Sequence, residues 1–220
     1  MDNGTVSFSL MELFRMGGVF MWPLLFFSIA TVFFSVERAI YFIYHNLRVS
    51  DIAAKVMEFI KSSDYPGAAD YLSGLIKRRM GARILLALIN ACSAKNGKAF
   101  SEHRTERAAE TEAASCVNSL ENGLNFLTAL GSLSPLTGFL GTVSGMISAF
   151  KSIAEATEVN AQIVANGIYE ALITTVFGLI IAIIAMIAHS IFTYLVDKFT
   201  AETEKNCSLL IAEIAERNEN

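Results

Sequence analysis

Three long stretches without a charged residue decide what this chain can fold into. They run from Met16 to Val36, from Asn122 to Phe150 and from Ala171 to Val196, and are 21, 29 and 26 residues long. A helix that crosses the hydrocarbon core of a bilayer needs about 20 apolar residues. A soluble helical bundle would show a polar stripe at helical spacing in each stretch, and none of the three has one. We therefore predict an all-α membrane protein with three transmembrane helices.

Basic residues are distributed unevenly around these stretches. Arg15 alone precedes the first stretch and Lys151 alone lies between the second and the third, whereas residues 48–110 contain eleven. Lys and Arg concentrate on the cytoplasmic side of membrane proteins. We therefore predict that the N-terminus lies outside and that the long loop and the C-terminal tail lie in the cytoplasm.

These two patterns give an order of segments, with long cytoplasmic helical extensions attached to the transmembrane helices. The order is an outer N-terminal segment (1–15), a first transmembrane helix (16–44), a cytoplasmic helical domain (45–121), a second transmembrane helix (122–152), an outer connection (153–160), a third transmembrane helix (161–196) and a cytoplasmic C-terminal helix (197–220).

The long loop has a helical pattern rather than that of a linker. Ile52 and Val56 belong to a run of apolar residues at helical spacing, and Asp51 is expected to cap that helix. Pro66 suits the start of a second helix, which is expected to be interrupted near Gly74 and then to continue.

A third helix is expected to begin near Phe100. The sequence after it contains no proline or glycine until Gly123, which predicts one unbroken helix from the cytoplasm into the second apolar stretch. The tail after Val196 is expected to extend the third transmembrane helix. Residues 7–16 are compatible with a short interfacial helix or with a disordered tail.

Small residues recur in the second apolar stretch, "LSPLTGFLGTVSGMISAF" (133–150). Ser134 and Gly138 form one pair at a spacing of four, and Gly141 and Gly145 form another. Glycine destabilises a helix in water, but in lipid such pairs let two helix backbones approach closely. These positions are therefore predicted to pack against another helix.

The same stretch contains polar atoms that can either serve packing or form part of a polar path. Pro135 removes the hydrogen bond to the carbonyl of Gly131 and frees an acceptor. In the packing interpretation, each hydroxyl bonds back to its own helix. The hydroxyl residues concerned are Thr137, Thr142, Ser144 and Ser148.

Glu170 stands at the outer end of the third uncharged stretch, in "NGIYEALITTVFGL". If the helix starts near Asn160, the carboxyl lies about 15 Å along it. An acid at such a depth usually faces a bundle interior or a wet cavity, although an interfacial carboxylate at the outer headgroups is the alternative. Thr174 shares its helix face, and Thr175 is expected to face a different neighbour or a pore. Burial penalises the charged form of a carboxyl, so this group suits proton exchange with nearby hydroxyls and water.

The sequence does not indicate enzyme chemistry. "GFLGTVSG" lies inside an apolar helix rather than after a strand, so a nucleotide-binding loop is not supported. Cys92, Cys116 and Cys207 lack metal-ligand spacing and fall in the predicted cytoplasmic parts, which indicates reduced structural thiols. No cofactor and no nucleic-acid partner is expected.

At these motifs the chain resembles the MotA/TolQ/ExbB proton-channel family, and specifically its ExbB/TolQ branch. The resemblance lies in "SPLTGFLGTVSGM", followed by "EALITTVFGLIIAI", and in "GGVFMWPLLFFSIATVFFSVERAIYF" for the first transmembrane helix. It covers the three transmembrane helices well and the loop by length and helicity. The flagellar stator branch has four transmembrane helices and a longer chain, so it fits less well.

The resemblance implies a homopentamer in the bacterial inner membrane around the transmembrane helices of an ExbD-like or TolR-like protein. Proton flow through this assembly would do work on a TonB-like or TolA-like protein, with the outer segments periplasmic and protons as the coupling ion.

By position, the resemblance assigns the proton path to Glu170, Thr142 and Thr175, and it makes the Glu37–Arg38 pair an anchor at the inner membrane interface. The chain departs from the family at residues 182–185, where Ala-Ile-Ile-Ala replaces Ala-Ile-Pro-Ala, and at 189–190, where His-Ser replaces Tyr-Asn.

Two classes of function remain open at this point. One is a proton-driven energy transducer. The other is a non-conducting membrane scaffold, in which small residues assemble helices and Glu170 is interfacial. A scaffold needs the glycines but does not need the acid, so Glu170 discriminates between the two.

Overall fold

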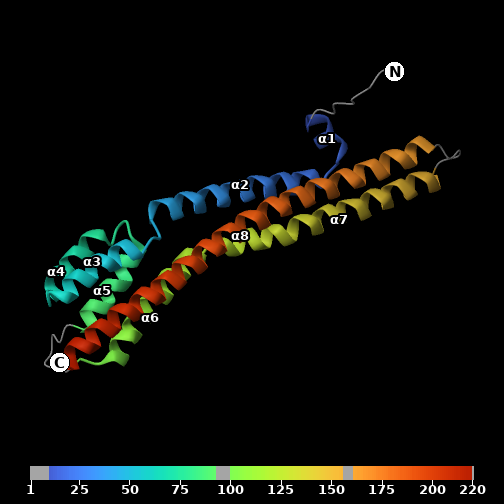
Figure 1. Ribbon diagram of the computed structural model, residues 1–220. Helices are drawn as coiled ribbons and strands as arrows, with labels where there is room; N and C mark the ends of the chain where they lie inside the picture. The colour runs from blue at the N-terminus through green and yellow to red at the C-terminus, as the bar shows by residue number, and fades with distance from the viewer. Residues whose placement is uncertain (1–9, 93–99, 156–160, 220) are drawn as a thin grey trace, which may run out of the picture. The chain divides into compact units, whose positions relative to one another are not determined.

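The computed structural model describes residues 10–92, 100–155 and 161–219, and their regular structure is helical (Figure 1). The helices in these ranges are α1 (Leu10–Met16), α2 (Met21–Tyr44), α3 (Ser50–Lys61), α4 (Tyr65–Leu75), α5 (Met80–Cys92), α6 (Glu102–Glu121), α7 (Leu124–Glu155) and α8 (Ala161–Glu219). Within the described residues, three helical stretches are long and apolar enough to cross a membrane: Met21–Tyr44, Glu102–Glu155 and Gly167–Asn218. The prediction of an all-α chain with three apolar membrane helices is confirmed.

The chain divides into two compact units. The membrane unit comprises the residues up to Val36 together with Asn125–Ser190, and it contains most of α2 and α7 and the first half of α8. The loop–tail unit comprises Glu37–Leu124 and Ile191–Asn220. Each unit has its own packing, and the two are described separately.

In the membrane unit, α7 and α8 touch through their backbones. A Cβ atom at Gly138 would lie 2.8 Å from the carbonyl oxygen of Thr174, and one at Gly178 would lie 2.6 Å from the carbonyl oxygen of Ser134. Further along, a Cβ at Gly145 would lie 3.1 Å from the carbonyl oxygen of Gly167. A larger side chain would force the backbones apart at Gly138 and Gly178, and it would make a tight contact at Gly145. The predicted small-residue positions therefore lie against α8 of the same chain.

Helix α2 packs on the same helix α8 through large apolar side chains. Met21 and Leu24 are buried against Ile173 and Ile181. The opposite side of α2 exposes large side chains, including Trp22 at 66%. Large apolar residues on the outer side are what a bundle surrounded by lipid requires, because lipid tails solvate apolar surface as well as a protein core does.

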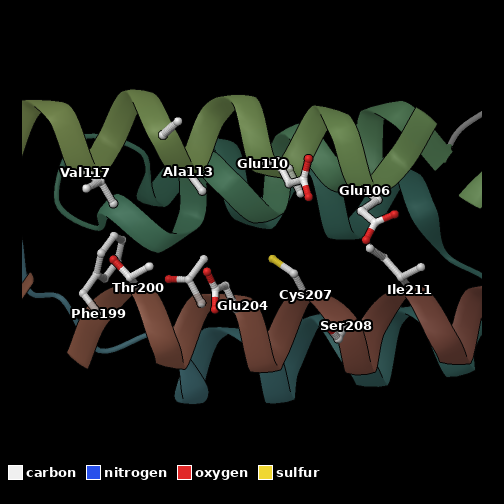
Figure 2. A pocket seen from close by; sticks show the side chains of 13 residues that line it. Glu106, Glu110, Ala113, Val117, Phe199, Thr200, Glu204, Cys207, Ser208 and Ile211 are labelled. Carbon is white, nitrogen blue, oxygen red and sulfur yellow. The ribbon is translucent and has the colours of Figure 1, made fainter. Parts of the chain in front are cut away.

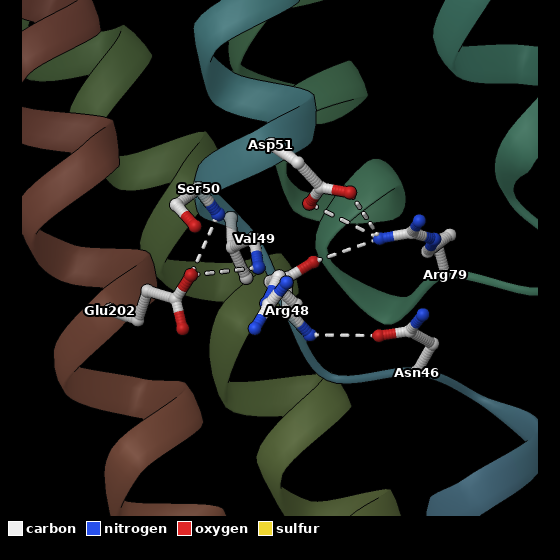
Figure 3. Close-up of polar contacts among 7 residues, drawn as sticks. All are labelled: Asn46, Arg48, Val49, Ser50, Asp51, Arg79 and Glu202. Atoms are coloured by element: carbon white, nitrogen blue, oxygen red, sulfur yellow. Dashed lines mark hydrogen bonds and ion pairs between the residues drawn. The ribbon is translucent and has the colours of Figure 1, made fainter.

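The N-terminus of α3 in the loop–tail unit is capped by a distant residue. One carboxylate oxygen of Glu202, on α8, accepts the backbone N–H groups of Val49 at 3.0 Å and Ser50 at 2.7 Å (Figure 3). The expectation that Asp51 caps this helix is wrong, because the N-cap residue is Val49 and Asp51 lies in the first turn. Asp51 instead pairs with Arg79 at 2.9 Å.

Helices α4 and α5 follow the predicted pattern in part. Asp64 accepts the backbone N–H of Gly67 at 2.9 Å, and Pro66 stands in the first turn of α4, as its fixed φ angle favours. The interruption lies at residues 76–79, slightly beyond the expected Gly74. The unit's core contains fully buried apolar side chains from α3, α4 and α5, among them Val56, Leu72 and Leu85.

The expectation of an unbroken helix from Phe100 into the second apolar stretch is wrong. Helix α6 ends at Glu121, its C-cap Asn122 is extended, and α7 starts at Leu124. Gly123 between them has a φ angle of +100°, which glycine adopts without the strain that a side chain would add. The tail, in contrast, extends the third apolar stretch as expected, since α8 is one helix of 59 residues.

The crossing of α7 and α8 predicts a sharp response at Gly138. Replacing Gly138 by Leu should lower the free energy of unfolding by about 1–3 kcal/mol or more, because overpacking here meets backbone atoms that cannot rotate away. The melting temperature of the purified protein in detergent measures this. Gly74→Leu is the matched control, since a Cβ at Gly74 meets nothing within 4 Å. Equal melting temperatures for the two variants would contradict the packing role.

The cap on α3 predicts a pH dependence. Burial raises the pKa of Glu202, but the hydrogen bonds from Ser50 and Val49 and the charge of Lys198 outweigh it and leave the pKa below its usual value. A lowered folded-state pKa means that this stabilisation is complete above the unfolded-state pKa of 4.5 and is lost as the pH falls through the folded-state value.

Glu202→Gln should therefore reduce hydrogen-exchange protection at Ser50 about fivefold near neutral pH, equivalent to the typical helix-cap loss of about 1 kcal/mol. At a pH below the folded-state pKa, the parent and the variant should converge. Glu204→Gln, on the same helix, should leave the protection of Ser50 unchanged. A parent that keeps its advantage in acid would show that the ionised carboxylate is not what caps the helix.

Candidate functional site

Glu170 lies in the membrane unit, near the start of α8, and its side chain is half-buried. Its carboxyl group rests on the turn that connects α1 to α2. A Cβ atom built at Gly18 would lie 1.9 Å from Oε1 of Glu170 and 2.9 Å from its Cδ. Gly18 also has a φ angle of +64°, in the left-handed region. The turn therefore requires glycine for its backbone angle, and a side chain at this position would displace the flexible carboxyl of Glu170.

Two opposing influences act on this carboxyl group. Partial burial among apolar helices penalises its charged form. The start of α2 lies three residues after Gly18, and the positive end of a helix dipole favours a negative charge nearby. No ion pair links Glu170 to a cation within the described ranges.

Thr174 and Thr175 both donate to one acceptor on the neighbouring helix. Their Oγ1 atoms each lie 3.2 Å from the carbonyl oxygen of Gly138. Thr174 also donates to the carbonyl of Ala171 at 2.8 Å. Thr175 therefore shares its neighbour with Thr174 and does not contact a different one, because the helices are so close at Gly138 that two adjacent threonines reach its carbonyl. The alternative that Thr175 faces a pore stays a prediction.

Thr142 lies one helical turn beyond Gly138 on α7, and its side chain is half-exposed. Its hydroxyl donates to the carbonyl of Phe139 in its own helix at 2.6 Å. Among the described residues, no hydrogen bond joins Thr142 to Thr175 or to Glu170. A proton relay through all three residues therefore requires intervening water.

The remaining predicted positions of α7 serve its contact with α8 or bond locally. A Cβ atom at Gly141 would lie 2.5 Å from Oγ1 of Thr174. Pro135 is accommodated inside α7, and its neighbour Ser134 donates to the carbonyl of Leu130 at 2.6 Å. Thr137 likewise bonds back to its own helix, to Leu133 at 2.9 Å. The hydroxyls of Ser134, Thr137 and Thr142 therefore each bond to a carbonyl of their own helix, as the packing interpretation expects.

Glu37 and Arg38, the predicted interface anchor, belong to the loop–tail unit. The guanidinium of Arg38 binds both carboxylate oxygens of Glu37, at 2.6 and 2.8 Å. Its Nη1 donates to the carbonyl of Asn122, at the break between α6 and α7. A Cβ at Gly123 would lie 3.1 Å from the guanidinium carbon. Arg38 therefore satisfies a carbonyl that the helix break leaves without an intrahelical partner.

Gly18 and Thr31 are two further residues of the membrane unit whose surroundings were not predicted from the sequence. Gly18 carries a signal, since a Gly-Gly pair stands directly before an apolar helix. Thr31 is 1% exposed in α2, and its Oγ1 has no hydrogen-bond partner among the described residues. Its signal is weak, because a single threonine in an apolar helix commonly bonds back to its own backbone.

Comparison with known proteins finds one family model and several relatives that agree with one another. Residues 77–205 match the model of the MotA/TolQ/ExbB proton channel family. The chain is 33% identical to the putative biopolymer transport protein ExbB-like 3 of Synechocystis over 178 residues, which are 80% of this chain and 81% of the relative.

Two further relatives match over shorter regions. The biopolymer transport protein ExbB of Salmonella typhimurium is 30% identical over 137 residues, 61% of this chain and 56% of the relative. The Tol-Pal system protein TolQ of Haemophilus influenzae is 45% identical over 74 residues, 34% of this chain and 32% of the relative. The matched region thus spans little more than half of the Salmonella protein and a third of the Haemophilus protein.

The family match covers more than half of the chain and includes Glu170 and the whole α7–α8 crossing, while the Synechocystis relative is matched over most of both chains. The chain has apolar helices for several membrane crossings, as a membrane subunit of this kind requires. It is therefore a member of the MotA/TolQ/ExbB proton channel family, on the side of its ExbB and TolQ proteins.

Proposed function

We propose that this protein is the proton-conducting subunit of an inner-membrane complex that converts the proton motive force into work on the cell envelope. The observation that carries the proposal is the Glu170 carboxyl, held half-buried against the Gly18 turn and one helical turn from Thr174. Membership of a proton-channel family supports it.

The energetic requirement explains why an acid is needed. One elementary charge crossing 100 mV releases about 2.3 kcal/mol, so useful work requires several protons to pass in sequence. Each proton must pause at a group that can be both charged and neutral near physiological pH. Glu170 is the carboxyl that we assign to this step, since it is half-buried in the membrane unit against the Gly18 turn. Thr175 and Thr142 supply hydroxyls that, with water, extend the path.

The family match also supports a proposal for the assembly. We propose a homopentamer around the transmembrane helices of an ExbD-like or TolR-like protein, coupled to a TonB-like or TolA-like protein. The N-terminus is periplasmic, and the long loop and the tail are cytoplasmic, as the distribution of basic residues favours. The names of the relatives, ExbB for biopolymer transport and TolQ for the Tol-Pal system, support this class of work and leave both branches open. The protein acts as a transporter subunit rather than an enzyme, and protons are its coupling ion.

A non-conducting scaffold is the competing function. The glycines at the α7–α8 crossing are compatible with it, because a scaffold also needs close helix packing. Backbone contact at Gly138 and Gly178 holds the helices together without any titratable group. The acid therefore separates the two functions, because a scaffold would tolerate its neutralisation.

Glu170→Gln should keep the fold and the assembly but reduce proton flux at least tenfold, because glutamine preserves size and cannot titrate. The measurement is proton flux into liposomes that contain this protein and its single-span partner. Glu155→Gln, which removes an exposed acid at the end of α7, should conduct like the parent. If Glu170→Gln also conducts like the parent, the carboxylate is interfacial and the scaffold function holds.

The other residues of the path should give graded effects in the same liposome assay. Glu170→Asp should keep part of the flux, because it retains a carboxyl on a shorter side chain. Thr175→Ala and Thr142→Ala should reduce flux several-fold, with the size of each loss set by how well water replaces the hydroxyl. Flux equal to the parent in both threonine variants would remove these two residues from the path.

Gly18→Ala tests whether the turn positions the carboxyl. The added Cβ would occupy the place of Oε1 of Glu170, so the carboxyl must move, and flux should fall several-fold. The same substitution in a Glu170→Asp background should cost less, because the shorter acid leaves room. Such non-additivity identifies direct contact. An equal loss in both backgrounds would indicate that backbone strain at Gly18 is responsible instead.

A further inference from the structure

A pocket of about 550 Å³ lies in the loop–tail unit between α6 and the last third of α8 (Figure 2). It is independent of the proton path, since all of its lining residues belong to the loop–tail unit. Its volume falls in the range of small-ligand sites. The apolar part of its wall includes Ala113 and Val117 of α6 and Phe199 of α8.

Three carboxylates surround this apolar wall. Glu106 and Glu110 stand one helical turn apart on α6, and Glu204 projects from α8. Within the described ranges, none of the three takes part in an ion pair. Arg107 and Lys205 are their neighbours in sequence but do not line the pocket. The pocket is therefore strongly acidic without a resident counter-charge.

A buried polar atom in the pocket is also without a partner. Thr203 lines the pocket and is 2% exposed, and its Oγ1 has no hydrogen-bond partner in the described part of the chain. An unpaired buried hydroxyl lowers the stability of the folded protein by about 1–3 kcal/mol, so such an atom calls for an explanation. A bound group that donates a hydrogen bond would supply it.

The protonation state of the Cys207 thiol argues against a metal ion as the ligand of this pocket. Burial raises the pKa of Cys207 to about 11, so the group is a neutral thiol at physiological pH. Thiolates are the form that binds soft metals, and the described residues contain no cluster of three metal-ligating side chains. The pocket thus offers carboxylates, a hydroxyl that can accept a hydrogen bond, and an apolar wall. This combination of groups is not typical of a metal site.

We propose that this pocket binds an alkylammonium ligand, in which one or more protonated amines are joined by a short methylene chain. The amines would pair with Glu106, Glu110 and Glu204, since charge-assisted hydrogen bonds to carboxylates are the strongest available. The methylenes would cover Ala113 and Phe199, as lysine stems cover apolar surface. An inner N–H would donate to Oγ1 of Thr203. Free polyamines and lysine side chains of a partner share this chemistry.

Isothermal titration of spermidine into the full-length protein in detergent tests the proposal. Saturable binding is expected, with one molecule per chain. Glu110→Gln should weaken it at least tenfold by removing a charge, and Ala113→Trp should weaken it at least tenfold by filling the pocket. Glu102→Gln removes the same charge from α6 outside the pocket and should leave binding within twofold of the parent. Circular dichroism and size exclusion verify that each variant is folded.

A trilysine peptide distinguishes the two sources of the ligand. Pocket-dependent binding of spermidine indicates a free polyamine, and pocket-dependent binding of trilysine alone indicates a partner's lysine. If neither binds, the proposal is wrong. It is also wrong if Glu102→Gln weakens binding as much as Glu110→Gln does, or if Ala113→Trp has no effect, because the amines would then be neutralising surface charge.

Discussion

The contact between the backbones of α7 and α8 at Gly138 is the constraint on which the membrane unit depends. With hydrogen as the side chain, the Gly138 carbonyl can receive hydroxyls from two consecutive threonines of the other helix. Gly178 repeats the arrangement from the opposite side, against the carbonyl of Ser134. In lipid there is no hydrophobic force between helices, so close packing and interhelical hydrogen bonds must hold them together. Such contacts also fix the register of α8.

The fixed register of α8 determines the surroundings of Glu170. Glu170 precedes Thr174 by one helical turn, so the register that seats Thr174 on Gly138 also aims the carboxyl at a defined neighbour. That neighbour is the Gly18 turn, which α2 carries because Met21 and Leu24 pack on Ile173 and Ile181. The apolar contacts of α2 and the glycine contacts of α7 therefore meet at one acid.

The features that could be predicted from sequence are those with a local period. Three uncharged stretches and small residues at a spacing of four indicated the membrane helices and the close-packed face of α7, because both patterns are contained within one helix. Contacts between distant positions left no such pattern. Glu202 caps a helix that begins 152 residues earlier, and Arg38 binds a carbonyl 84 residues away. Gly123 did signal the helix break, but the Ala-rich and Glu-rich run before it favoured continuity.

The acids of this chain differ in function because their partners differ. Glu202 accepts two backbone N–H groups and lies near Lys198, so its charged form is stabilised and it serves the fold. Glu37 is held by both branches of one guanidinium. Glu170 has no cation partner within the described residues and rests instead on a glycine turn near the start of a helix. An acid whose charge is fixed by strong partners cannot exchange protons at a useful rate. These sparse surroundings distinguish Glu170 from Glu202 and Glu37, and they are what the proposed proton-carrying role requires.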